Sequence, residues 1–407
     1  MSEPESIVIA GAGLAGAKAA ETLRTEGFGG RITLLGSELL RPYERPPLSK
    51  GLLLGTTGPD EPFVHAASWY PDNAVDLRLG AVVTGIDRAA RVVHTASGED
   101  VGYDRLLLAT GAMPRRPAGA ETFAHTFRTR EDSDRFHAAI EKNARLVIVG
   151  AGWIGMEVAA AARQRGAHVT VVTPDRLPLR KVLGDTVAQV FADLHREHGV
   201  EFRFGAHATE ILPDRVVLDD GTTLAADAVL VAIGAVPNDA LAVEAGLATG
   251  DGVHVDALHT TSDPAIFAAG DVAAVDHPLL GARIRVEHWA NALDSGPAAA
   301  RAMLGRGTPW DRLPFFFTDQ FDLGMEYAGH VPPGTETRLV VRGDLARREA
   351  IVFWLAGDRV AAGMNLNVWD VQDQIQDLIR AGLAGRAVDL ARLSDESVPL
   401  TELVPGS

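Results

Sequence analysis

Two glycine-rich turns are the residues of this sequence whose types and spacing most directly suggest chemistry. Residues 11–16 read GAGLAG and residues 150–155 read GAGWIG, so both turns have glycine at the first, third and sixth positions. Between a buried strand and a helix, the first glycine permits a tight turn, the second lets a pyrophosphate approach the backbone, and the third lets helix and strand pack closely. The helix N-terminus then faces the phosphates. Each turn predicts a dinucleotide site, although a glycine-rich turn without such a function is the alternative for either one alone.

The residues around both turns have the hydrophobic pattern that such sites need. A continuous apolar run precedes each turn, at residues 7–10 and 145–149, as expected for buried parallel strands. Helices and returning strands are expected at residues 15–25, 31–35, 154–165 and 168–172. The chain therefore repeats a whole strand–turn–helix–strand unit. This repeat favours an α/β fold with two Rossmann-type nucleotide-binding domains.

Three further segments end a buried strand in a small-residue turn. Residues 103–112 and 228–237 follow the two units in this way, with glycine at Gly111 and Gly234. Residues 261–272 end in Gly270 and Asp271 but have no glycine-rich turn of their own. We expect this last segment to return to the first half, which would make that domain discontinuous.

The composition changes after about residue 318. Apolar runs with charged breaks follow at residues 338–341, 350–355 and 359–364, and residues 372–381 are amphipathic. An antiparallel sheet with a helix is expected there. We therefore predict a first nucleotide-binding domain of residues 1–115 and 248–318, a second nucleotide-binding domain of residues 116–247, and a C-terminal α+β domain of residues 319–407.

Acidic residues after the second strand of each unit would hold ribose hydroxyls. Glu38, beside Ser37, has the right place in the first unit, with a solvated surface glutamate as the alternative. In the second unit Thr173 stands where the acid is expected, and Asp175 and Arg176 follow. An acid favours NAD and an arginine can accept the 2′-phosphate of NADP, so both coenzymes stay open, with NADH preferred.

A short segment at residues 45–50, RPPLSK, is stiffened by two prolines. Taken alone, it could be an ordinary loop. If Lys50 is buried it needs a partner, because a lone buried charge is costly. Glu157, two residues past Gly155, is a candidate.

Bulk properties exclude several classes of protein. The net charge of -16 is opposite in sign to that of a nucleic-acid binder. The chain has no cysteine, which rules out disulfides, a thiolate nucleophile, and cysteine-ligated zinc or iron–sulfur sites, and no metal site is expected. No signal peptide is recognisable and no apolar run approaches about 18 residues. We therefore expect a cytoplasmic protein that does not interact with a membrane.

These motifs together resemble the FAD-dependent ferredoxin reductases of bacterial oxygenase systems, the group of the putidaredoxin and biphenyl dioxygenase reductases. The resemblance spans essentially the whole chain. It rests on GAGLAG, RPPLSK, LLLATGA, GAGWIGMEVA, TSDPAIFAAGD, the EHW stretch at residues 287–289 and PFFFTDQFD at residues 314–322. It implies a glutathione-reductase-like fold, FAD as cofactor, and NADH (NADPH possible) as electron donor.

The resemblance also implies which residues bind the cofactors. Those expected at FAD are Gly11, Gly13, Leu14, Ala15, Gly16, Ser37, Glu38, Arg45, Lys50, Val83, Ala109, Thr110, Gly111, Arg128, Gly270, Asp271, Glu287, His288, Trp289 and Phe317. Those expected at the nicotinamide nucleotide are Gly150, Gly152, Ile154, Gly155, Glu157, Thr173, Arg176 and Gly234. Lys50 and Glu157 would form a catalytic ion pair at the flavin that bridges the two nucleotide domains. There the lysine would stabilise negative charge on the reduced ring.

Three departures from the family pattern bear on these implications. Thr173 replaces the usual acid, which affects the choice of coenzyme. Ser37 stands where some members have aspartate, a role that Glu38 can cover. Phe317 and Phe321 stand where relatives often have tryptophan and tyrosine, and Phe317 is still expected near the flavin.

The expected activity is hydride transfer from NADH to FAD, followed by two single-electron transfers to a [2Fe–2S] ferredoxin that serves a haem monooxygenase or a Rieske dioxygenase. The alternatives are an NAD(P)H oxidase, a small-molecule reductase of the monodehydroascorbate type, and a redox-responsive binding protein like apoptosis-inducing factor. A monomer or weak homodimer is expected. Because such ferredoxins are acidic, docking would need a basic rim, and the candidate clusters, unless they are ordinary solvated arginines, are Arg301, Arg306 and Arg312, or Arg342, Arg347 and Arg348.

Overall fold

The computed structural model describes residues 4–117 and 123–404. These residues form two compact units, each assembled from separate parts of the sequence. The first unit comprises residues 1–44, 60–113 and 236–314, and the second comprises residues 45–59, 114–235 and 315–407. The predicted division into three domains therefore differs from these units and stays a prediction.

A five-stranded parallel sheet forms the centre of the first unit, in the order β19-β7-β1-β2-β3. Its strands are β1 (Ser6–Ala10), β2 (Arg31–Gly36), β3 (Val75–Leu79), β7 (Arg105–Leu108) and β19 (Ile266–Ala268). The position of β19 beside β7 confirms that the segment around Asp271 returns to the first half of the chain. Both faces of the sheet are buried, which explains why its strands are apolar without alternation.

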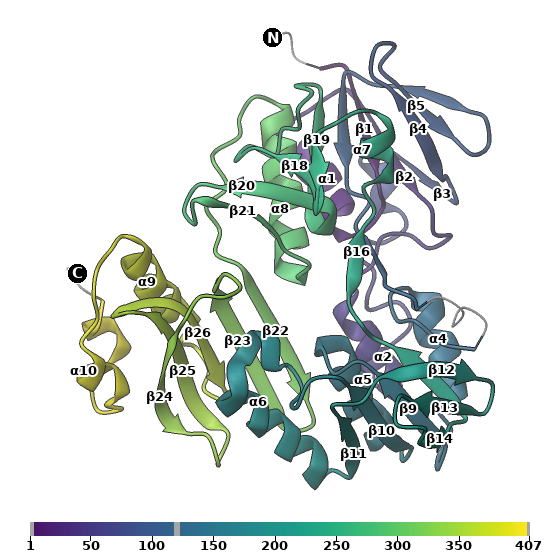
Figure 1. The fold of residues 1–407 in the computed structure, drawn as a ribbon. Coiled ribbons are helices and arrows are strands. Elements are labelled where there is room, and N and C mark those ends of the chain that lie inside the picture. The colour runs from purple at the N-terminus through teal and green to yellow at the C-terminus, as the bar shows by residue number, and fades with distance from the viewer. Residues whose placement is uncertain (1–3, 118–122, 405–407) are drawn as a thin grey trace. The chain divides into compact units, whose positions relative to one another are not determined.

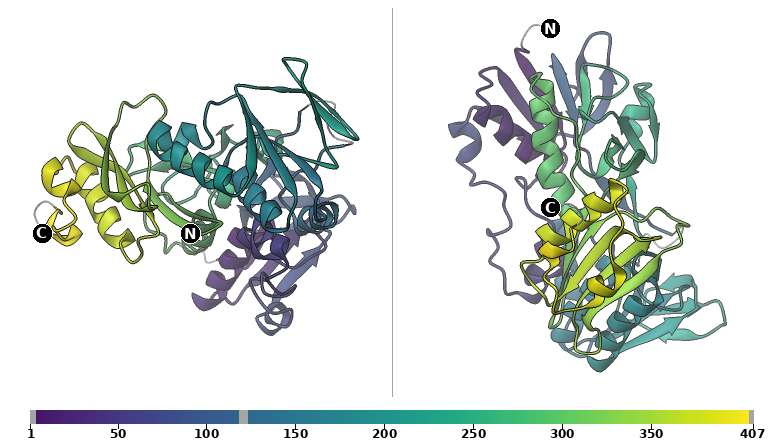
Figure 2. Two further views of the ribbon diagram at one scale, coloured as in Figure 1. Left: turned by 90° about the horizontal axis from the view of Figure 1, so that it is seen from below. Right: turned by 90° about the vertical axis from the view of Figure 1, so that its left-hand side faces the viewer.

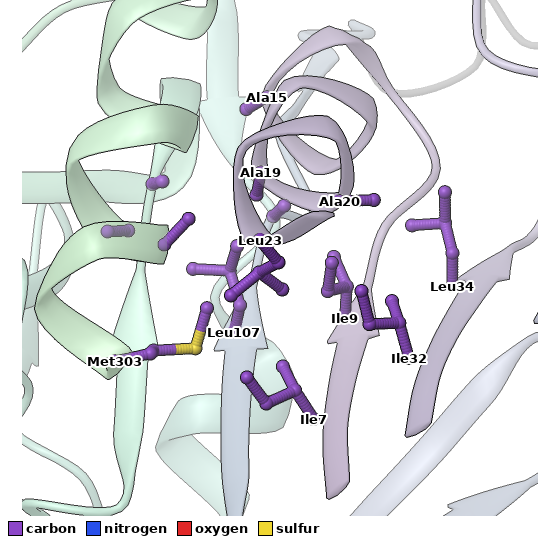
Figure 3. Packing of buried hydrophobic residues seen from close by; sticks show 14 of the residues in the cluster. Ile7, Ile9, Ala15, Ala19, Ala20, Leu23, Ile32, Leu34, Leu107 and Met303 are labelled. Carbon is purple, nitrogen blue, oxygen red and sulfur yellow. The ribbon is translucent and has the colours of Figure 1, made fainter. Parts of the chain in front are cut away.

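Two helices cover one face of this sheet. The helix α1 (Leu14–Thr25) follows the first glycine-rich turn, and α8 (Trp289–Met303) packs beside it. Figure 3 shows Ile7 and Ile9 of β1 below α1, with Leu23 of the helix and Met303 of α8 closing the same cluster. The small side chains of α1 let it lie close to its neighbours.

Short strands of two further sheets cover the opposite face. Val8 and Ala10 of β1 point into this second cluster, together with Val93, Val253 and Val275. The covering strands are β4 (Val83–Asp87), β5 (Val92–Thr95), β6 (Asp100–Gly102), β17 (Thr249–Gly250), β18 (Gly252–Val255), β20 (Ala273–His277) and β21 (Ala282–Arg285). The short helices of this unit are α3 (Trp69–Asp72), α7 (Ala240–Glu244) and η2 (Gly270–Val272).

The second unit contains the repeat that the sequence predicted. Its parallel sheet has the order β11-β10-β9-β15, with strands β9 (Arg145–Val149), β10 (His168–Thr173), β11 (Val200–Phe204) and β15 (Ala228–Val231). The helix α5 (Trp153–Gln164) follows the second glycine-rich turn. An antiparallel sheet of β12 (Ala208–Leu212), β13 (Arg215–Leu218) and β14 (Thr223–Ala225) lies in the same unit.

Two helices of this unit were not predicted. The helix α4 (Arg130–Ala139) begins with a capping box, in which Thr129 and Asp132 exchange side-chain and backbone hydrogen bonds. The helix α6 (Arg180–Glu197) contains Gly184 at φ 72°, a left-handed conformation that interrupts it after its first turn. Residues 45–59 form η1 (Pro46–Ser49) and α2 (Gly51–Leu54), which pack on α4 and α5 and so belong to this unit.

The C-terminal residues form a five-stranded antiparallel sheet in the order β22-β23-β26-β25-β24. Three strands match the predicted apolar runs, namely β24 (Arg338–Asp344), β25 (Glu349–Ala356) and β26 (Arg359–Leu366). The strands β22 (Phe315–Gln320) and β23 (Leu323–Gly329) were not predicted. The predicted helix is α9 (Gln372–Leu383), drawn in yellow against the yellow-green strands in Figure 2. The remaining elements are β8 (Ala112–Pro114), β16 (Ala235–Pro237), α10 (Leu390–Ser394) and η3 (Leu400–Glu402).

Two searches of the structure bear on function. Within residues 4–117 and 123–404, no helix has both the length and the apolar content that a membrane crossing needs. The same residues include no group of three or more histidine, aspartate or glutamate side chains placed to hold a metal ion.

Candidate functional site

The first glycine-rich turn forms a cradle whose three glycines have separate roles. Gly11 has φ +123°, and a Cβ there would lie 2.1 Å from the backbone oxygen of Ala109. A Cβ on Gly16 would lie 2.0 Å from the backbone oxygen of Gly11. At Gly13, the N-cap of α1, a Cβ would meet nothing within 4 Å. The outer glycines are therefore required by packing, whereas Gly13 faces open space at the positive end of a helix, where a pyrophosphate would bind.

The second turn repeats this arrangement contact by contact. A Cβ on Gly150 would lie 2.3 Å from the backbone oxygen of Ala232, and one on Gly155 would lie 2.3 Å from that of Gly150. Gly152 is the N-cap of α5, and its position is again open. Ile154 and Ile233 are large apolar side chains that stay exposed at the edge of this cradle, each at 41%. The second cradle therefore has the same capacity to receive a dinucleotide phosphate.

The two cradles differ at the end of their second strands. After β2, Ser37 is exposed and Glu38 is half-buried, and the Glu38 carboxylate accepts a 2.5 Å hydrogen bond from the Tyr43 hydroxyl. After β10, Thr173 is buried, and its Oγ1 accepts a hydrogen bond from the backbone N–H of Asp175 at 3.3 Å. Only the first strand end therefore offers a carboxylate directly, as the sequence suggested.

Charged residues after β10 are engaged with one another. Asp175 pairs with Lys181 at 3.2 Å. Arg176 donates to Asp185, which also accepts from Arg180 at 2.6 Å. Hydrogen bonds from Arg180 and Arg176 lower the pKa of the Asp185 carboxyl below its ordinary value. The arginine that could take a 2′-phosphate therefore already has an anionic partner.

Other residues expected at FAD surround the first cradle. Thr110 donates its hydroxyl to the backbone oxygen of Asn238 at 2.7 Å, and the Asn238 amide returns a 2.8 Å bond to the Thr110 backbone oxygen. The backbone N–H of Gly270 donates to the hydroxyl of Ser295 on α8 at 2.9 Å, which fixes the turn before Asp271. Asn238 and Ser295 are not among the predicted site residues, and nothing in their local sequence marks them.

The segment before α8 is also fixed in place. The backbone oxygen of Asp271 accepts a 3.1 Å bond from Arg285, which also pairs with Glu287 at 2.5 Å and with Asp251 at 3.1 Å. His288 is the N-cap of α8, and burial lowers the pKa of its imidazole to about 4, so this side chain is neutral. The remaining members of the predicted FAD set in this unit are Leu14, Ala15, Val83, Gly111 and Trp289.

Lys50 and Glu157 lie together in the second unit. The distance from Lys50 Nζ to Glu157 Oε1 is 3.8 Å, so the predicted ion pair is present. Because residues 45–59 belong to the same unit as α5, the pair lies inside that unit rather than bridging two, which corrects the expectation. A carboxylate that the sequence did not indicate is closer to Lys50, since Asp319 Oδ2 lies at 3.0 Å.

Residues on both faces of the strand β22 contact this pair. Phe317 and Asp319 alternate with Thr318 along the strand. The Lys50 ammonium lies 4.3 Å from the centre of the Phe317 ring, a cation–π contact. Phe317 therefore lies beside Lys50, and its expected place at the flavin stays a prediction. Thr318 and Asp319 were missed because β22 itself was missed.

Glu157 is held mainly by hydroxyl groups. Its carboxylate accepts a 2.5 Å bond from Ser49 at Oε2 and a 2.5 Å bond from Thr318 at Oε1. Burial raises the pKa of the Glu157 carboxyl, and the charge of Lys50 and the two hydroxyl hydrogen bonds counter this rise. Hydrogen bonds to both oxygens stabilise the charged form of Glu157 against the larger effect of its burial.

The other predicted residues of the second unit are Arg45, Arg128 and Gly234. Arg45 donates to the backbone oxygen of Arg128, which joins the RPPLSK segment to the start of α4. Gly234 is exposed, with φ +100°. The structure thus gathers the second cradle, Lys50, Glu157 and Phe317 in one unit and the first cradle with Glu38 and Asp271 in the other.

Most arginines of the two clusters expected for docking have partners in the structure, and their role in docking stays a prediction. Arg301 and Arg306 both pair with Glu26. Arg342 is buried and donates to backbone oxygens of residues 395, 396 and 398. The remaining pairs are Arg347 with Asp344, and Arg348 with Glu197 and Asp322. Neighbouring acids or carbonyls thus largely satisfy these arginines.

Comparison with known families decides where the chain belongs. Residues 5–296 match the pyridine nucleotide-disulphide oxidoreductase family, and residues 315–404 match the reductase C-terminal family. The chain is a member of the pyridine nucleotide-disulphide oxidoreductase family. Both cradles and the Lys50–Glu157 pair lie within the region matched to this family.

Full-length relatives narrow the comparison. The chain is 38% identical to the ferredoxin–NAD(+) reductase component of the anthranilate 1,2-dioxygenase system of Burkholderia cepacia, over 97% of this chain and 98% of that protein. It is 36% identical to putidaredoxin reductase of Pseudomonas putida, over 99% of this chain and 98% of that protein. These matches confirm the resemblance that the sequence motifs suggested.

Solved structures show the same relationship. The covalent putidaredoxin reductase–putidaredoxin complex has a TM-score of 0.92 and 34% identity, with 98% of each chain covered. The ferredoxin reductase for the CYP199A2 system from Rhodopseudomonas palustris also has a TM-score of 0.92, at 32% identity, with 98% of this chain and 99% of that chain covered. The expected fold, that of the pyridine nucleotide-disulphide oxidoreductases with two Rossmann-type halves, is confirmed.

Proposed function

We propose that this chain is an FAD-dependent NADH:ferredoxin oxidoreductase that supplies electrons to the [2Fe–2S] ferredoxin of an oxygenase system. The observation that carries this proposal is the presence of two equivalent, open glycine cradles in a chain without cysteine. Two cradles provide for two dinucleotides. Without a cysteine pair, electrons that enter the protein need an acceptor outside the chain.

The residues of the first unit fit FAD. Gly13 leaves room for the pyrophosphate at the N-terminus of α1, and Glu38 offers a carboxylate for the ribose hydroxyls. The segment of Gly270 and Asp271 is fixed beside this helix, because a Cβ on Gly270 would lie 3.1 Å from the Ala15 Cβ. FAD would supply the redox chemistry, taking a hydride from the nicotinamide and giving up electrons singly.

The residues of the second unit fit the nicotinamide nucleotide and the charged pair. Gly152 receives the phosphates and the exposed Ile154 and Ile233 provide apolar surface beside them. Lys50 brings a positive charge whose position is set by Asp319, Glu157 and Phe317. A preorganised cation of this kind stabilises negative charge that develops during the reaction.

NADH is the proposed coenzyme. Asp185 engages both Arg176 and Arg180, so a 2′-phosphate would have to displace a carboxylate to reach either one. Asp175, whose side chain is 28% exposed, is the acid nearest to the end of β10 and could hold a ribose hydroxyl. The structure therefore supports NADH through the residues that follow Thr173 rather than through Thr173 itself.

The cellular setting is part of the proposal. The relatives include a component of the anthranilate 1,2-dioxygenase system and a reductase of putidaredoxin, which supports a partner ferredoxin in an oxygenase system. We propose a cytoplasmic location and a monomer or weak homodimer. The terminal enzyme would be a haem monooxygenase or a Rieske dioxygenase.

Steady-state reduction of cytochrome c tests the proposed function. The purified flavin-loaded protein is given NADH or NADPH, with and without an added [2Fe–2S] ferredoxin. Strong dependence on ferredoxin, with NADH as the better donor, is expected. Equal consumption of NADH with and without ferredoxins from several oxygenase systems would instead favour an oxidase or a small-molecule reductase.

A further inference from the structure

A chain of buried hydrogen bonds begins at Glu157 Oε1, the carboxylate oxygen that also faces Lys50. Thr318 Oγ1 donates to Glu157 Oε1 at 2.5 Å, and Gln320 Nε2 donates to Thr318 Oγ1 at 3.2 Å. His195 Nε2, on α6, lies 2.8 Å from Gln320 Oε1. Thr318 and Gln320 are each 1% exposed and His195 is 0% exposed. The three side chains therefore exchange hydrogen bonds without help from bulk water.

The donors in this chain all point in one direction. Gln320 donates its amide hydrogen to Thr318, which leaves the Thr318 hydroxyl hydrogen for Glu157. Gln320 Oε1 can then only accept, so His195 carries its proton on Nε2. Burial lowers the pKa of His195 to about 4, so its imidazole is neutral and has a single N–H. Read from His195, every link donates toward Glu157.

Donation in the reverse direction, from Glu157 toward His195, would be unfavourable at His195. If Glu157 were protonated and donated to Thr318, the Gln320 amide would have to turn and donate to His195 Nε2. The imidazole proton would then sit on Nδ1, which is buried and has no hydrogen-bond partner among the residues that the structure describes. A buried N–H without an acceptor carries the full cost of its desolvation. The environment of His195 therefore favours the direction in which Glu157 Oε1 accepts from Thr318, and this hydrogen bond stabilises the ionised carboxylate.

We propose that Thr318, Gln320 and His195 are positioning residues for the charged pair, and that their one-way chain of hydrogen bonds keeps the Glu157 carboxylate ionised and oriented toward Lys50. This inference rests on the proposed function, in which Lys50 acts at the bound flavin. It assigns a role to the C-terminal sheet, because two of the three residues come from β22. The residues act through Glu157 and are not themselves catalytic.

The charged groups near Glu157 define what a titration would report. Lys50 faces it from the segment before α2 and Asp319 faces it from β22. The charge of Asp319 raises the pKa of Glu157, and the charge of Lys50 lowers it. Loss of the Thr318 hydroxyl bond removes a further stabilisation of the charged form, so the pKa of Glu157 should rise.

Infrared spectroscopy of the oxidised, flavin-loaded protein would follow this titration directly. The carbonyl band of protonated Glu157 is identified by its absence from a Glu157→Gln variant, and its amplitude is measured against pH. In Thr318→Val and Gln320→Glu the midpoint should rise by about one pH unit or more. In Thr318→Ser, which keeps the hydroxyl, the midpoint should stay at the wild-type value.

Variants of His195 test the far end of the chain. His195→Asn retains an amide donor and should leave the midpoint in place, whereas His195→Leu should raise it. Thr33→Val is the matched control, because Thr33 is fully buried and its hydroxyl has no partner among the described residues. In anaerobic stopped-flow, the acidic midpoint of the hydride-transfer rate should shift in parallel, with the KM for NADH unchanged.

The outcomes separate this inference from the proposed function. Unchanged midpoints in both Thr318→Val and Gln320→Glu would overturn the inference, as would a Thr318→Ser midpoint that moves as far as that of Thr318→Val. The infrared titration needs no ferredoxin, so it stays valid if the protein proves not to reduce one. Failure of the wild-type protein to bind FAD would instead contradict the proposed function.

Discussion

The first and second glycine cradles use the same contacts but carry different charges on the helix that follows. In both cradles the first glycine lies against the backbone just after a neighbouring parallel strand, which is β7 for Gly11 and β15 for Gly150. The third glycine of each turn lies against the backbone of the first glycine, and the middle glycine faces open space. Two residues past the third glycine, α1 has Lys18 and α5 has Glu157. Lys18 is half-buried and paired with Glu21, whereas Glu157 is 8% exposed and holds two hydroxyl hydrogen bonds. The repeat thus preserves the phosphate cradle, and only one copy adds buried charge.

The middle glycines should separate the two nucleotides. In Gly13→Ala a methyl group enters the open space of the first cradle, so the protein should fold but be purified largely without flavin. In Gly152→Ala the protein should retain its flavin, and its KM for NADH should rise by about tenfold, equivalent to about 1.4 kcal/mol. Flavin absorbance per protein and steady-state kinetics measure the two effects.

Variants of the outer glycines provide the control for Gly13→Ala and Gly152→Ala. Gly11→Ala and Gly150→Ala would place a Cβ 2.1 Å and 2.3 Å from a backbone oxygen. Both variants should therefore lower the free energy of unfolding, whereas the middle-glycine variants should mainly weaken nucleotide binding. If Gly152→Ala lost as much flavin as Gly13→Ala, the assignment of one cradle to each nucleotide would be contradicted.

The two lysines Lys50 and Lys18 should differ in their effect on the reaction. Lys50→Ala removes a cation held by two carboxylates and an aromatic ring, so flavin reduction by NADH should slow by about 100-fold. Lys18→Ala breaks a half-buried pair within α1 and should leave the rate within about twofold. Anaerobic stopped-flow at saturating NADH compares the two, and equal rates would remove Lys50 from the mechanism.

The strand ends should differ in their response to a 2′-phosphate. Asp185→Asn frees Arg176 and Arg180, so kcat/KM with NADPH should rise by about tenfold while that with NADH changes little. A double variant that also carries Arg176→Ala should lose much of the gain. Binding of 2′,5′-ADP by calorimetry provides a second readout, and no gain by either method would mean that Asp185 does not restrict the coenzyme.

The smallest expected effect concerns a feature that the two halves share. Asp104 precedes β7 and accepts from the backbone N–H groups of Glu5 and Ser6, and Asp227 precedes β15 and accepts from the backbone and side chain of Arg145. The Arg145 hydrogen bonds lower the pKa of Asp227 from 3.8 to about 2. A lowered folded-state pKa gives stability that is present above pH 3.8 and is lost as the pH falls toward 2.

Asp104→Asn and Asp227→Asn should therefore each lower the free energy of unfolding at pH 7 by about 1 kcal/mol or less, because both carboxylates are partly in water. Urea titrations at several pH values measure this. The variants should also show a weaker loss of stability between pH 4 and pH 2 than the wild type. A difference in only one half would show that the shared contact does not have a shared role.

The sequence predicted the features that depend on local pattern. The glycine turns, their flanking strands and helices, and three strands of the C-terminal sheet all appear in the structure, because each is set by the hydrophobic period and by residues adjacent in the chain. The pairing of Lys50 with Glu157 was also anticipated, from the family resemblance and the need of a buried charge for a partner.

The features that were missed depend on contacts between distant segments or on irregular elements. Gly184 interrupts α6 and Pro297 lies inside α8, so neither stretch shows an unbroken helical pattern. Ser49, Thr318 and Asp319 contact the charged pair only because η1 and β22 pack on α5. Their residue types are common at surfaces, and no spacing in the sequence connects them with Glu157.

The most direct test of the central claim is a single-turnover experiment with ferredoxin. The flavin-loaded protein is reduced anaerobically with one equivalent of NADH and then mixed with excess oxidised [2Fe–2S] ferredoxin. Our account predicts rapid reoxidation of the protein with two ferredoxins reduced for each flavin, and much slower reoxidation by oxygen alone. Reoxidation by oxygen that is as fast as that by each of several [2Fe–2S] ferredoxins would contradict it.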